Sequence, residues 1–364
     1  MGRTPVPQGA GVSFFKKGSV MADHLYGTEE LLPMVDSLFI PGNFLVKAVF
    51  PGMMEFDTEQ VSFDRVLDDL RMAPLVSPYS PGEVQQPRGY QKESIVPAYV
   101  KPRNPVPANQ VMKRLAGERP WGELSAAERR DLIVLNLLTG HRTKIDRRCE
   151  WMAASIIRTG SLVLVGNKYP AVTVNFQRAA ALTKQLLTTD RWGETGVSPY
   201  DDVDGWVDEV GEESGAAVNL VIMDKDAWKL YIADPKARLA LDKTLGQNSV
   251  AYELGLTVQL PGSPVFKGRD GNIEFYVYND TYEADNGSIS KLLPQYSVAL
   301  ISQGGVQGTM AYGLVQDALN NFEKGAYFSK NWIDMDTGAE LLESTSAPIP
   351  VPGRINATCF VQVR

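Results

Sequence analysis

The residues that could carry chemistry in this chain of 364 residues are few and widely separated. It has two histidines, His24 and His141, and two cysteines, Cys149 and Cys359. His141 lies in a predicted helix among arginines and a lysine, which is a poor setting for a metal ligand. We interpret both histidines as solvated or locally hydrogen-bonded side chains rather than ligands. Each cysteine sits in an apolar pattern, which favours a small buried residue over a disulfide or a redox role.

Motifs that would hold a cofactor or a nucleophile were not found. We find no Gly-x-Gly-x-x-Gly after a strand, no phosphate-binding loop of the Walker type and no Gly-x-Ser-x-Gly turn. The stretch Asp201–Gly205 suggests a calcium loop, but it lacks the alternate spacing and the glutamate at the twelfth position. Acids in the first turn of a helix are the favoured interpretation. The sequence therefore predicts no catalytic residue, no cofactor, no metal and no enzyme activity.

The clearest concentration of charge is a basic run within the longest predicted helix. It consists of Arg142, Lys144, Arg147 and Arg148. Such a run is usually a solvated face or a set of ion pairs between subunits, and less often a contact for phosphate groups. The whole chain carries a net charge of −7, which does not favour a nucleic-acid-binding protein.

The composition, with 44% hydrophobic and 22% charged residues, is typical of a globular protein. The length of 364 residues suggests about two domains. No apolar run approaches the roughly 18 residues needed to span a bilayer, so we expect no membrane partner. The N-terminal residues lack the apolar region of a signal peptide, and residues 1–23 are interpreted as a flexible arm. Met21 is either a second start codon or simply a methionine, and a leader and a cloning artefact are the alternatives to an arm for residues 1–23.

The elements that would position any site begin with a long helix. Ser125 and Glu128 form a capping box that opens a helix predicted over residues 125–159, and Gly160 ends it. Its apolar stripe is predicted to be Leu135, Leu138, Ile145, Cys149, Met152 and Ile156. Gly140 indicates either a bend or the close approach of another backbone. A hairpin is predicted next, with strands at 162–165 and 172–176.

The remaining pattern mixes helices and strands without regular alternation, which is typical of an α+β protein. Buried strands are predicted at 218–223, 273–278 and 296–301, and helices after Asp224 and Asp234. In the last strand, alternate residues are expected to share one face, namely Ala357, Cys359, Val361 and Val363. Near the N-terminus we expect a short helix at 28–35, and an extended segment from Phe39 to Phe56 because Pro-Gly pairs interrupt it.

Proline-rich sequence separates two strand-like segments, at 61–76 and 95–100. Eight of the chain's 23 prolines lie between residues 74 and 107. Proline removes a backbone donor, so it belongs on edge strands or outside a sheet. We interpret the whole region as a long projecting β-excursion, with its tip near Pro81-Gly82 and Arg88-Gly89. The valine and tyrosine residues between the prolines favour ordering against another surface.

At this region the chain resembles the lambda-like major capsid proteins of tailed phages. The shared segments in the projecting region are Val76–Pro78, Gly82–Val84, Arg88–Gly89 and Tyr99–Pro102. Further matches follow in similar order, at Tyr200–Asp202, the strand from Val218 with Trp228 after it, Gln316–Ala318, Lys330–Trp332 and Ser346–Pro348. The similarity runs from about residue 25 to the C-terminus.

The resemblance implies the tailed-phage major capsid fold, called HK97-like, in the α+β class. It implies an N-terminal arm over 1–55 and an extended loop over 56–115. A peripheral domain with the long spine helix would cover 116–200, and an axial domain 201–322. Residues 323–364 would return to the peripheral domain.

The resemblance also implies a structural protein of the virion, assembled in the bacterial cytoplasm. It would self-assemble into hexamers and pentamers of an icosahedral head that encloses double-stranded DNA through weak, non-specific contacts. Expected partners are a scaffold and a portal protein during assembly, and a decoration protein at threefold positions. Two alternatives are a same-fold nanocompartment shell that encloses protein cargo and a soluble hydrolase or transferase. The nanocompartment would need a cargo-binding pocket, and the lambda-type motifs argue against it. The hydrolase or transferase would need a catalytic constellation, which was not found.

Two sets of site residues follow from the resemblance as hypotheses. The first is an intersubunit contact made by Val76, Pro78, Gly82, Glu83, Arg88, Gly89, Tyr99, Lys101, Pro102 and Arg103. The second is the basic face of the spine helix, Arg142, Lys144, Arg147 and Arg148. This face would meet the acids of a neighbouring subunit or, as the less favoured alternative, DNA. Some members of the wider fold join subunits by a lysine–asparagine bond, for which Lys92 and Asn356 are the candidates, but the lambda-like group does not use it.

Overall fold

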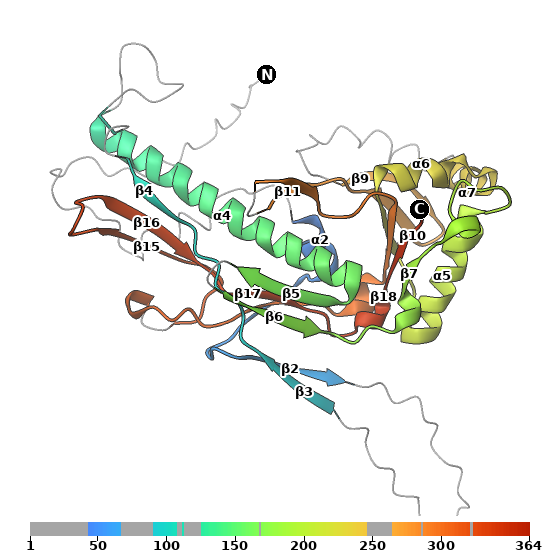
Figure 1. The fold of residues 1–364 in the computed structure, drawn as a ribbon, viewed down its shortest axis with the longest axis horizontal. Helices are drawn as coiled ribbons and strands as arrows, with labels where there is room; N and C mark the ends of the chain where they lie inside the picture. Colours follow the sequence, from blue (N-terminus) through green and yellow to red (C-terminus); the bar gives the residue numbers. More distant parts are fainter. Residues whose placement is uncertain are drawn as a thin grey trace, which may run out of the picture.

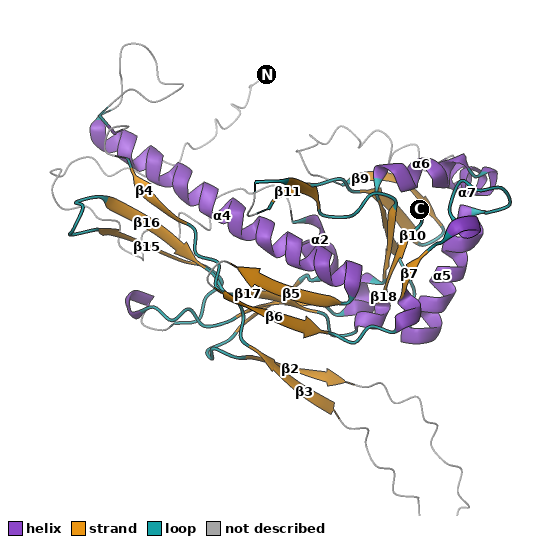
Figure 2. Ribbon diagram, in the orientation of Figure 1, coloured by secondary structure: helices purple, strands orange, loops and turns teal. Residues whose placement is uncertain are grey.

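The computed structural model describes residues 43–66, 90–107, 111–112, 125–166, 169–245, 264–284, 287–320 and 323–364. Figure 1 shows an elongated molecule in which one long helix runs through the body and a sheet covered by helices lies at one end. Figure 2 shows helices and strands mixed along the chain, as expected for the α+β class.

The helices are α2 (Phe44–Val49), α4 (Ala126–Thr159), α5 (Pro199–Ser214), α6 (Lys225–Ala233), α7 (Pro235–Leu245) and α9 (Gln303–Val306). The strands up to β9 are β1 (Gly52–Glu55), β2 (Val61–Val66), β3 (Tyr90–Ile95), β4 (Arg103–Val106), β5 (Ser161–Gly166), β6 (Tyr169–Asn175), β7 (Thr183–Gln185), β8 (Leu220–Met223) and β9 (Val265–Asp270). The later strands are β10 (Ile273–Val277), β11 (Thr281–Glu283), β12 (Ile289–Lys291), β13 (Ser297–Ile301), β14 (Thr309–Tyr312), β15 (Phe328–Ile333), β16 (Glu340–Thr345), β17 (Pro348–Val351) and β18 (Thr358–Gln362).

Helix α4 is the predicted spine helix, and its two ends lie where the sequence places them. The Ser125 hydroxyl accepts a hydrogen bond from the Glu128 N–H, and the Glu128 carboxylate accepts one from the Ser125 N–H, so the capping box is confirmed. Gly160 ends the helix with a φ of 66°, in the left-handed region. The predicted stripe is buried from Leu138 to Ile156, and only Leu135 is half-buried.

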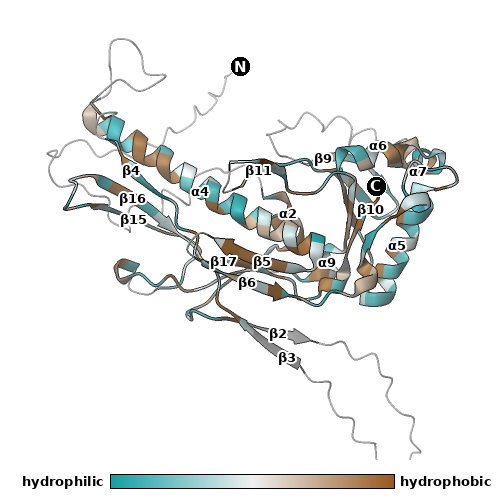
Figure 3. Ribbon diagram, in the orientation of Figure 1, coloured by the Kyte–Doolittle hydropathy of each residue, from teal (hydrophilic) through white to brown (hydrophobic). Residues whose placement is uncertain are grey.

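A six-stranded sheet runs in the order β7-β18-β13-β8-β10-β9, and its central strands β8 and β13 are buried on both faces. Alternate residues of its central strands enter two different apolar cores, which is the pattern of a sheet covered on both sides. In β8, for example, Ile222 belongs to the core that includes α4, and Val221 belongs to the core formed with α5, α6 and α7. Figure 3 shows hydrophilic and hydrophobic residues interleaved along α4, and hydrophobic residues in β5 beside it.

The C-terminal strand β18 differs from its predicted pattern at one residue. Cys359, Val361 and Val363 lie in the core beneath α5–α7, as expected for alternate residues of one strand. Ala357 lies in the opposite core. The physical reason is that Ala357 ends a short 3₁₀ turn, Ile355–Ala357, so it precedes the strand and does not follow its alternation.

A smaller core joins the first half of α4 to a three-stranded sheet in the order β15-β16-β4. Leu342 of β16 packs with Ile133, Val134 and Leu138 of the helix. The hairpin of β5 and β6 that follows α4 is confirmed, with Leu162 opposite Val174 and a register shift after Leu164.

Residues 44–49 were expected to be extended, and this expectation is wrong. They form helix α2, which buries Leu45, Ala48 and Val49 in the same core as α4. After it, β1 pairs in parallel with β14, from Gly52 opposite Thr309 to Glu55 opposite Tyr312. The helix predicted at 28–35 lies outside the described residues.

The projecting excursion has the predicted hairpin form, but its second strand comes earlier than expected. Strand β3 pairs antiparallel with β2, from Tyr90 opposite Val66 to Ile95 opposite Val61. The second strand was predicted at 95–100, and it ends at Ile95 instead. Pro97 has no N–H to donate to a ladder, and among residues 96–100 only Val100 pairs, in an isolated bridge to Ser346.

Candidate intersubunit surfaces

The first candidate surface is the hairpin of β2 and β3, which points away from the body in Figure 1. The two strands form a sheet of their own, and no other described strand pairs with either of them. The predicted contact residues at the tip of this excursion, Val76, Pro78, Gly82, Glu83, Arg88 and Gly89, lie outside the described residues. The structure thus describes the stem of the excursion and its direction.

The other four predicted contact residues lie on the body of the chain and not on the hairpin. The Tyr99 hydroxyl donates to the Leu314 carbonyl at 2.8 Å, and the Pro102 carbonyl accepts from the Ser344 N–H at 3.1 Å. Lys101 lies 4.8 Å from the centre of the Tyr99 ring. Arg103 begins β4, and its backbone pairs with β16. The backbone of Pro102 and Arg103 and the hydroxyl of Tyr99 therefore bond within the chain itself. The Lys101 and Arg103 side chains are exposed, and an intersubunit role for the four residues stays a prediction.

The predicted basic face of α4 is divided between internal contacts and solvent. Arg142 donates from Nε to Asp146 Oδ2 at 3.2 Å, and its guanidinium lies 3.5 Å from the centre of the Tyr327 ring. Arg148 lies over the Trp151 ring. Lys144 and Arg147 are exposed, although Arg147 also donates to the Thr281 carbonyl at 3.4 Å. The cations that face outward are therefore Lys144 and Arg147.

Sequence reasoning missed Glu150, which fixes the N-terminal end of helix α2. Its carboxylate is buried in α4 and accepts from the Leu45 N–H at 2.7 Å and the Val46 N–H at 3.1 Å. The Tyr278 hydroxyl donates to it at 2.8 Å. Asn43, the first residue before α2, makes no side-chain cap, so Glu150 takes that role from 105 residues away. Burial raises the pKa of Glu150, and the three donors oppose that rise.

His141 is buried in contacts that the sequence did not indicate. One ring nitrogen lies 3.0 Å from Ser344 Oγ, and the other lies 3.0 Å from Asn104 Oδ1. Ser344 Oγ in turn lies 2.9 Å from Ser329 Oγ. The expected solvated or locally bonded histidine is therefore wrong: the partners lie on β4 and β16, far along the chain. Burial lowers the pKa of His141 to about 4, and the charge of Lys144 adds to this shift.

The described residues contain no group of three or more side chains that could hold a metal ion. Cys149 and Cys359 are both free and buried, as predicted, and burial raises the pKa of Cys359 to about 12. Asp201 and Asp202 lie in the first turn of α5, where the Trp192 indole N–H donates to Asp202 at 2.8 Å. The helix-start interpretation of these acids is confirmed. No helix in the described part of the chain is long and apolar enough to cross a membrane.

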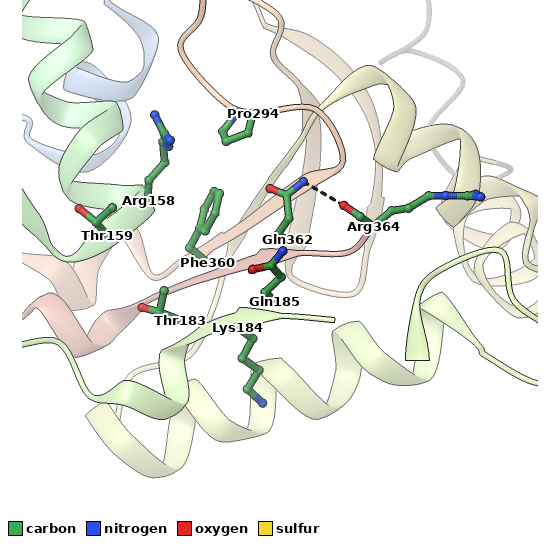
Figure 4. A pocket seen from close by; sticks show the side chains of 9 residues that line it. All are labelled: Arg158, Thr159, Thr183, Lys184, Gln185, Pro294, Phe360, Gln362 and Arg364. Carbon is green, nitrogen blue, oxygen red and sulfur yellow. Dashed lines mark hydrogen bonds between the residues drawn. The ribbon is translucent and has the colours of Figure 1, made fainter. Parts of the chain in front are cut away.

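A depression of about 640 Å³ lies between the end of α4 and the end of β18. Figure 4 shows the side chains that line it. It is lined by Arg158, Thr159, Thr183, Lys184, Gln185, Pro294, Phe360, Gln362 and Arg364. Lys184 extends away from it in Figure 4 and pairs with Glu209. These lining residues include no carboxylate side chain, histidine or cysteine.

A long helix, a sheet covered by helices at one end and a projecting hairpin define the fold class, which is the HK97-like α+β fold. Comparison with solved structures agrees. A prophage capsid protein from Escherichia coli CFT073 superposes with a TM-score of 0.72 at 22% identity, over 93% of this chain and 99% of that one. The capsid of an empty GTA particle superposes with a TM-score of 0.51 at 10% identity, over 89% and 91% of the two chains.

Sequence comparison gives the family. The model of the family described as phage major capsid protein E matches residues 27–363. The major capsid protein of Escherichia phage lambda is 27% identical over 89% of this chain and 95% of its own length. That of Enterobacteria phage P21 is 27% identical over 93% of this chain and 99% of its own. The chain belongs to the phage major capsid protein E family and is a lambda-like major capsid protein.

Proposed function

We propose that the chain self-assembles into the hexamers and pentamers of an icosahedral phage head that encloses double-stranded DNA. Membership of the capsid family supports a shell role. The observation that carries the proposal is the hairpin of β2 and β3, which leaves the body and forms a sheet of only two strands. An isolated two-stranded hairpin is marginally stable in water, so it needs a further surface to cover it.

In this proposal a neighbouring copy supplies that surface. Proline lowers the entropy that the excursion loses on docking, and its valine and tyrosine residues supply apolar contact and strand pairing. The tip residues Val76, Pro78, Gly82, Glu83, Arg88 and Gly89 would make this contact. Each copy gives one excursion and receives one, so assembly covers edges that are open in the single chain.

The domain division that we propose follows the sequence boundaries, with one refinement. The arm would be residues 1–55, the extended loop 56–115, the peripheral domain 116–200, the axial domain 201–322 and the return segment 323–364. Because α2 and β1 pack on the chain's own body, the exchanged part of the arm would precede Asn43.

Proposed partners are a scaffold and a portal protein during assembly in the bacterial cytoplasm, and a decoration protein at threefold positions of the virion. DNA would be held by weak, non-specific contacts, and the net charge of −7 supports weak contact. On the basic face of α4, Lys144 and Arg147 would meet acids of a neighbouring copy, with DNA as the less favoured partner. The alternative of a nanocompartment shell predicts particles that enclose protein and no nucleic acid.

Sedimentation velocity of the expressed chain, followed by electron microscopy of any fast-sedimenting material, tests the proposal. The expected result is uniform icosahedral particles, alone or on addition of the scaffold protein. A compact 40.0 kDa monomer whose residues 67–89 resist protease, with or without a scaffold, would contradict it. Particles that contain a protein cargo would favour the nanocompartment.

A further inference from the structure

The sheet of β15, β16 and β4 has a second face, opposite the one that packs on α4. On this outer face Trp332 lies opposite Leu341, and Leu341 lies opposite Pro105, so one row across the three strands is apolar. The next row is charged, with Lys330 opposite Glu343 and Glu343 opposite Arg103. Trp332 and Leu341 are half-exposed and Pro105 is exposed, so an apolar row on a strand face remains open to solvent.

Arg103 stands out among the charged residues of this face. Lys330 is neutralised by Asp317 and by Glu343, which lies 3.4 Å from it. Arg103 makes no ion pair with any described residue, although its charge contributes to the lowered pKa of Asp334 in the adjacent turn of the same chain. Its guanidinium lies 4.8 Å from the centre of the Trp332 ring. Stacking on an aromatic ring leaves the N–H groups at the edge of a guanidinium available, and their fork matches a carboxylate. The face therefore offers an apolar row beside an unpaired cation.

The turn that joins β15 to β16 carries the complementary groups. Met335 is 93% exposed and lies between Asp334 and Asp336, with Ile333 48% exposed beside it. The turn is held by its own hydrogen bonds: Asp334 accepts from the Thr337 hydroxyl at 2.8 Å and from the Gly338 N–H at 2.7 Å. The Asp336 carboxylate makes no bond to a described residue. A fixed turn thus presents one large apolar side chain and an unpaired acid to solvent.

We infer that this end of the body is a self-complementary contact between copies of the chain. The Met335 side chain of one copy packs on the Trp332–Leu341–Pro105 row of a second copy, and Asp336 of the first copy pairs with Arg103 of the second. We choose a second copy as the partner because one end of the chain carries two complementary surfaces. One is the apolar row beside Arg103, and the other is the turn that presents Met335 and Asp336. The inference rests on the proposed self-assembly and names two surfaces that meet in it.

A charge exchange tests the ion pair. Arg103→Asp and Asp336→Arg should each lower the yield of particles about tenfold, since each leaves like charges facing one another. The double variant should restore the yield to within about twofold of the unaltered chain. Arg103→Asp combined with Asp208→Arg, an exposed acid on α5, is the matched control and should not recover. Single variants that assemble normally, or recovery in the control, would overturn the pairing.

A second experiment tests the apolar contact without relying on charge. Chains with Met335→Cys and chains with Leu341→Cys are assembled separately and as a mixture, and oxidised. The mixture should contain more disulfide-linked dimer than either chain assembled alone. The native cysteines are buried, so the link forms between position 335 of one copy and position 341 of another. Particles without this dimer would overturn the inference and leave the shell function standing. If the unaltered chain forms no particles at all, the proposed function itself fails.

Discussion

At the scale of single residues, His141 and Glu150 show how the spine helix is fixed to its surroundings. Each is a polar side chain buried in α4, and each bonds to groups far away in the sequence. His141 joins the helix to β4 and β16, and Glu150 joins it to α2 and to the end of β10. A buried polar group is costly without partners, so both positions should be sensitive to substitution.

His141 predicts a specific dependence of stability on pH. Its pKa is about 4 in the folded chain, below the ordinary value of 6.5, so the folded state favours the neutral ring. Between those two values the unfolded chain binds more protons, and stability falls as the pH falls. Urea unfolding at several pH values should show the free-energy difference between the unaltered chain and His141→Gln constant above pH 7 and shrinking toward pH 4. A difference that grows as the pH falls would contradict the assignment.

Glu150→Ala should detach α2 from the spine helix. The substitution leaves two backbone N–H groups and the Tyr278 hydroxyl without their acceptor, at an expected cost of about 2–4 kcal/mol. Tyr278→Phe is the matched control, because it removes one donor and should cost about 1 kcal/mol. Hydrogen exchange of the amides of residues 44–50 should become faster in the alanine variant. Unchanged exchange there would show that apolar packing alone holds α2.

These two residues also mark where prediction from sequence fails. The partners of Glu150 lie 105 and 128 positions away, and no local pattern around 150 indicates them. Helix α2 was expected to be extended because Pro-Gly pairs flank it in the sequence. The group that caps it, Glu150, belongs to another helix, so no local signal marks its start. The cysteines and the acids of α5 were predicted correctly, since burial and helix starts leave a local signal.

At the scale of elements, α4 was predicted closely because both of its ends are set by neighbouring residues. The capping box at Ser125 and the left-handed glycine at 160 are local signals. The second strand of the projecting hairpin was misplaced because its register depends on the pairing of Val61 with Ile95, which the sequence does not show. The tip residues of the predicted contact lie outside the described residues, so that part of the site stays a prediction.

Two glycines at the same helix predict opposite responses to alanine. A Cβ at Gly140 would have no described atom within 4 Å. Of the two alternatives for this glycine, a bend or the close approach of another backbone, the close approach is therefore not found within the described chain. Gly140→Ala should raise the free energy of unfolding by about 1 kcal/mol. A Cβ at Gly160 would lie 2.7 Å from the Cβ of Arg178, at a φ of 66°. Gly160→Ala should lower that free energy by about 2 kcal/mol.

Arg178 explains why an alanine at position 160 should destabilise the fold. Its guanidinium donates to the carbonyls of Ile157 at 2.6 Å and Arg158 at 2.8 Å, which are among the last of α4. It therefore caps the C-terminus of the helix and ties it to the start of β7 through Thr183. Thermal or urea unfolding of the two glycine variants measures the contrast. Equal effects at both positions would contradict this account of the helix ends.

At the scale of the whole molecule, the chain is a folded body with a projecting hairpin, β2 and β3, that pairs with no third strand among the described residues. The body has its own cores on both faces of the six-stranded sheet, so it should fold without the excursion. The excursion should affect the assembly of copies and not the folding of the single chain. Folding and assembly are therefore predicted to be separable, which gives the central claim its sharpest test.

That test replaces residues 67–89 by a short glycine–serine linker and compares sedimentation velocity with the unaltered chain under assembly conditions. Thermal unfolding of the two chains is the control for folding and should agree within a few degrees. We predict that the altered chain stays folded and sediments as single subunits or small oligomers, while the unaltered chain forms particles. Particles of equal size and yield from the altered chain would show that the excursion does not join the subunits, and would contradict the account.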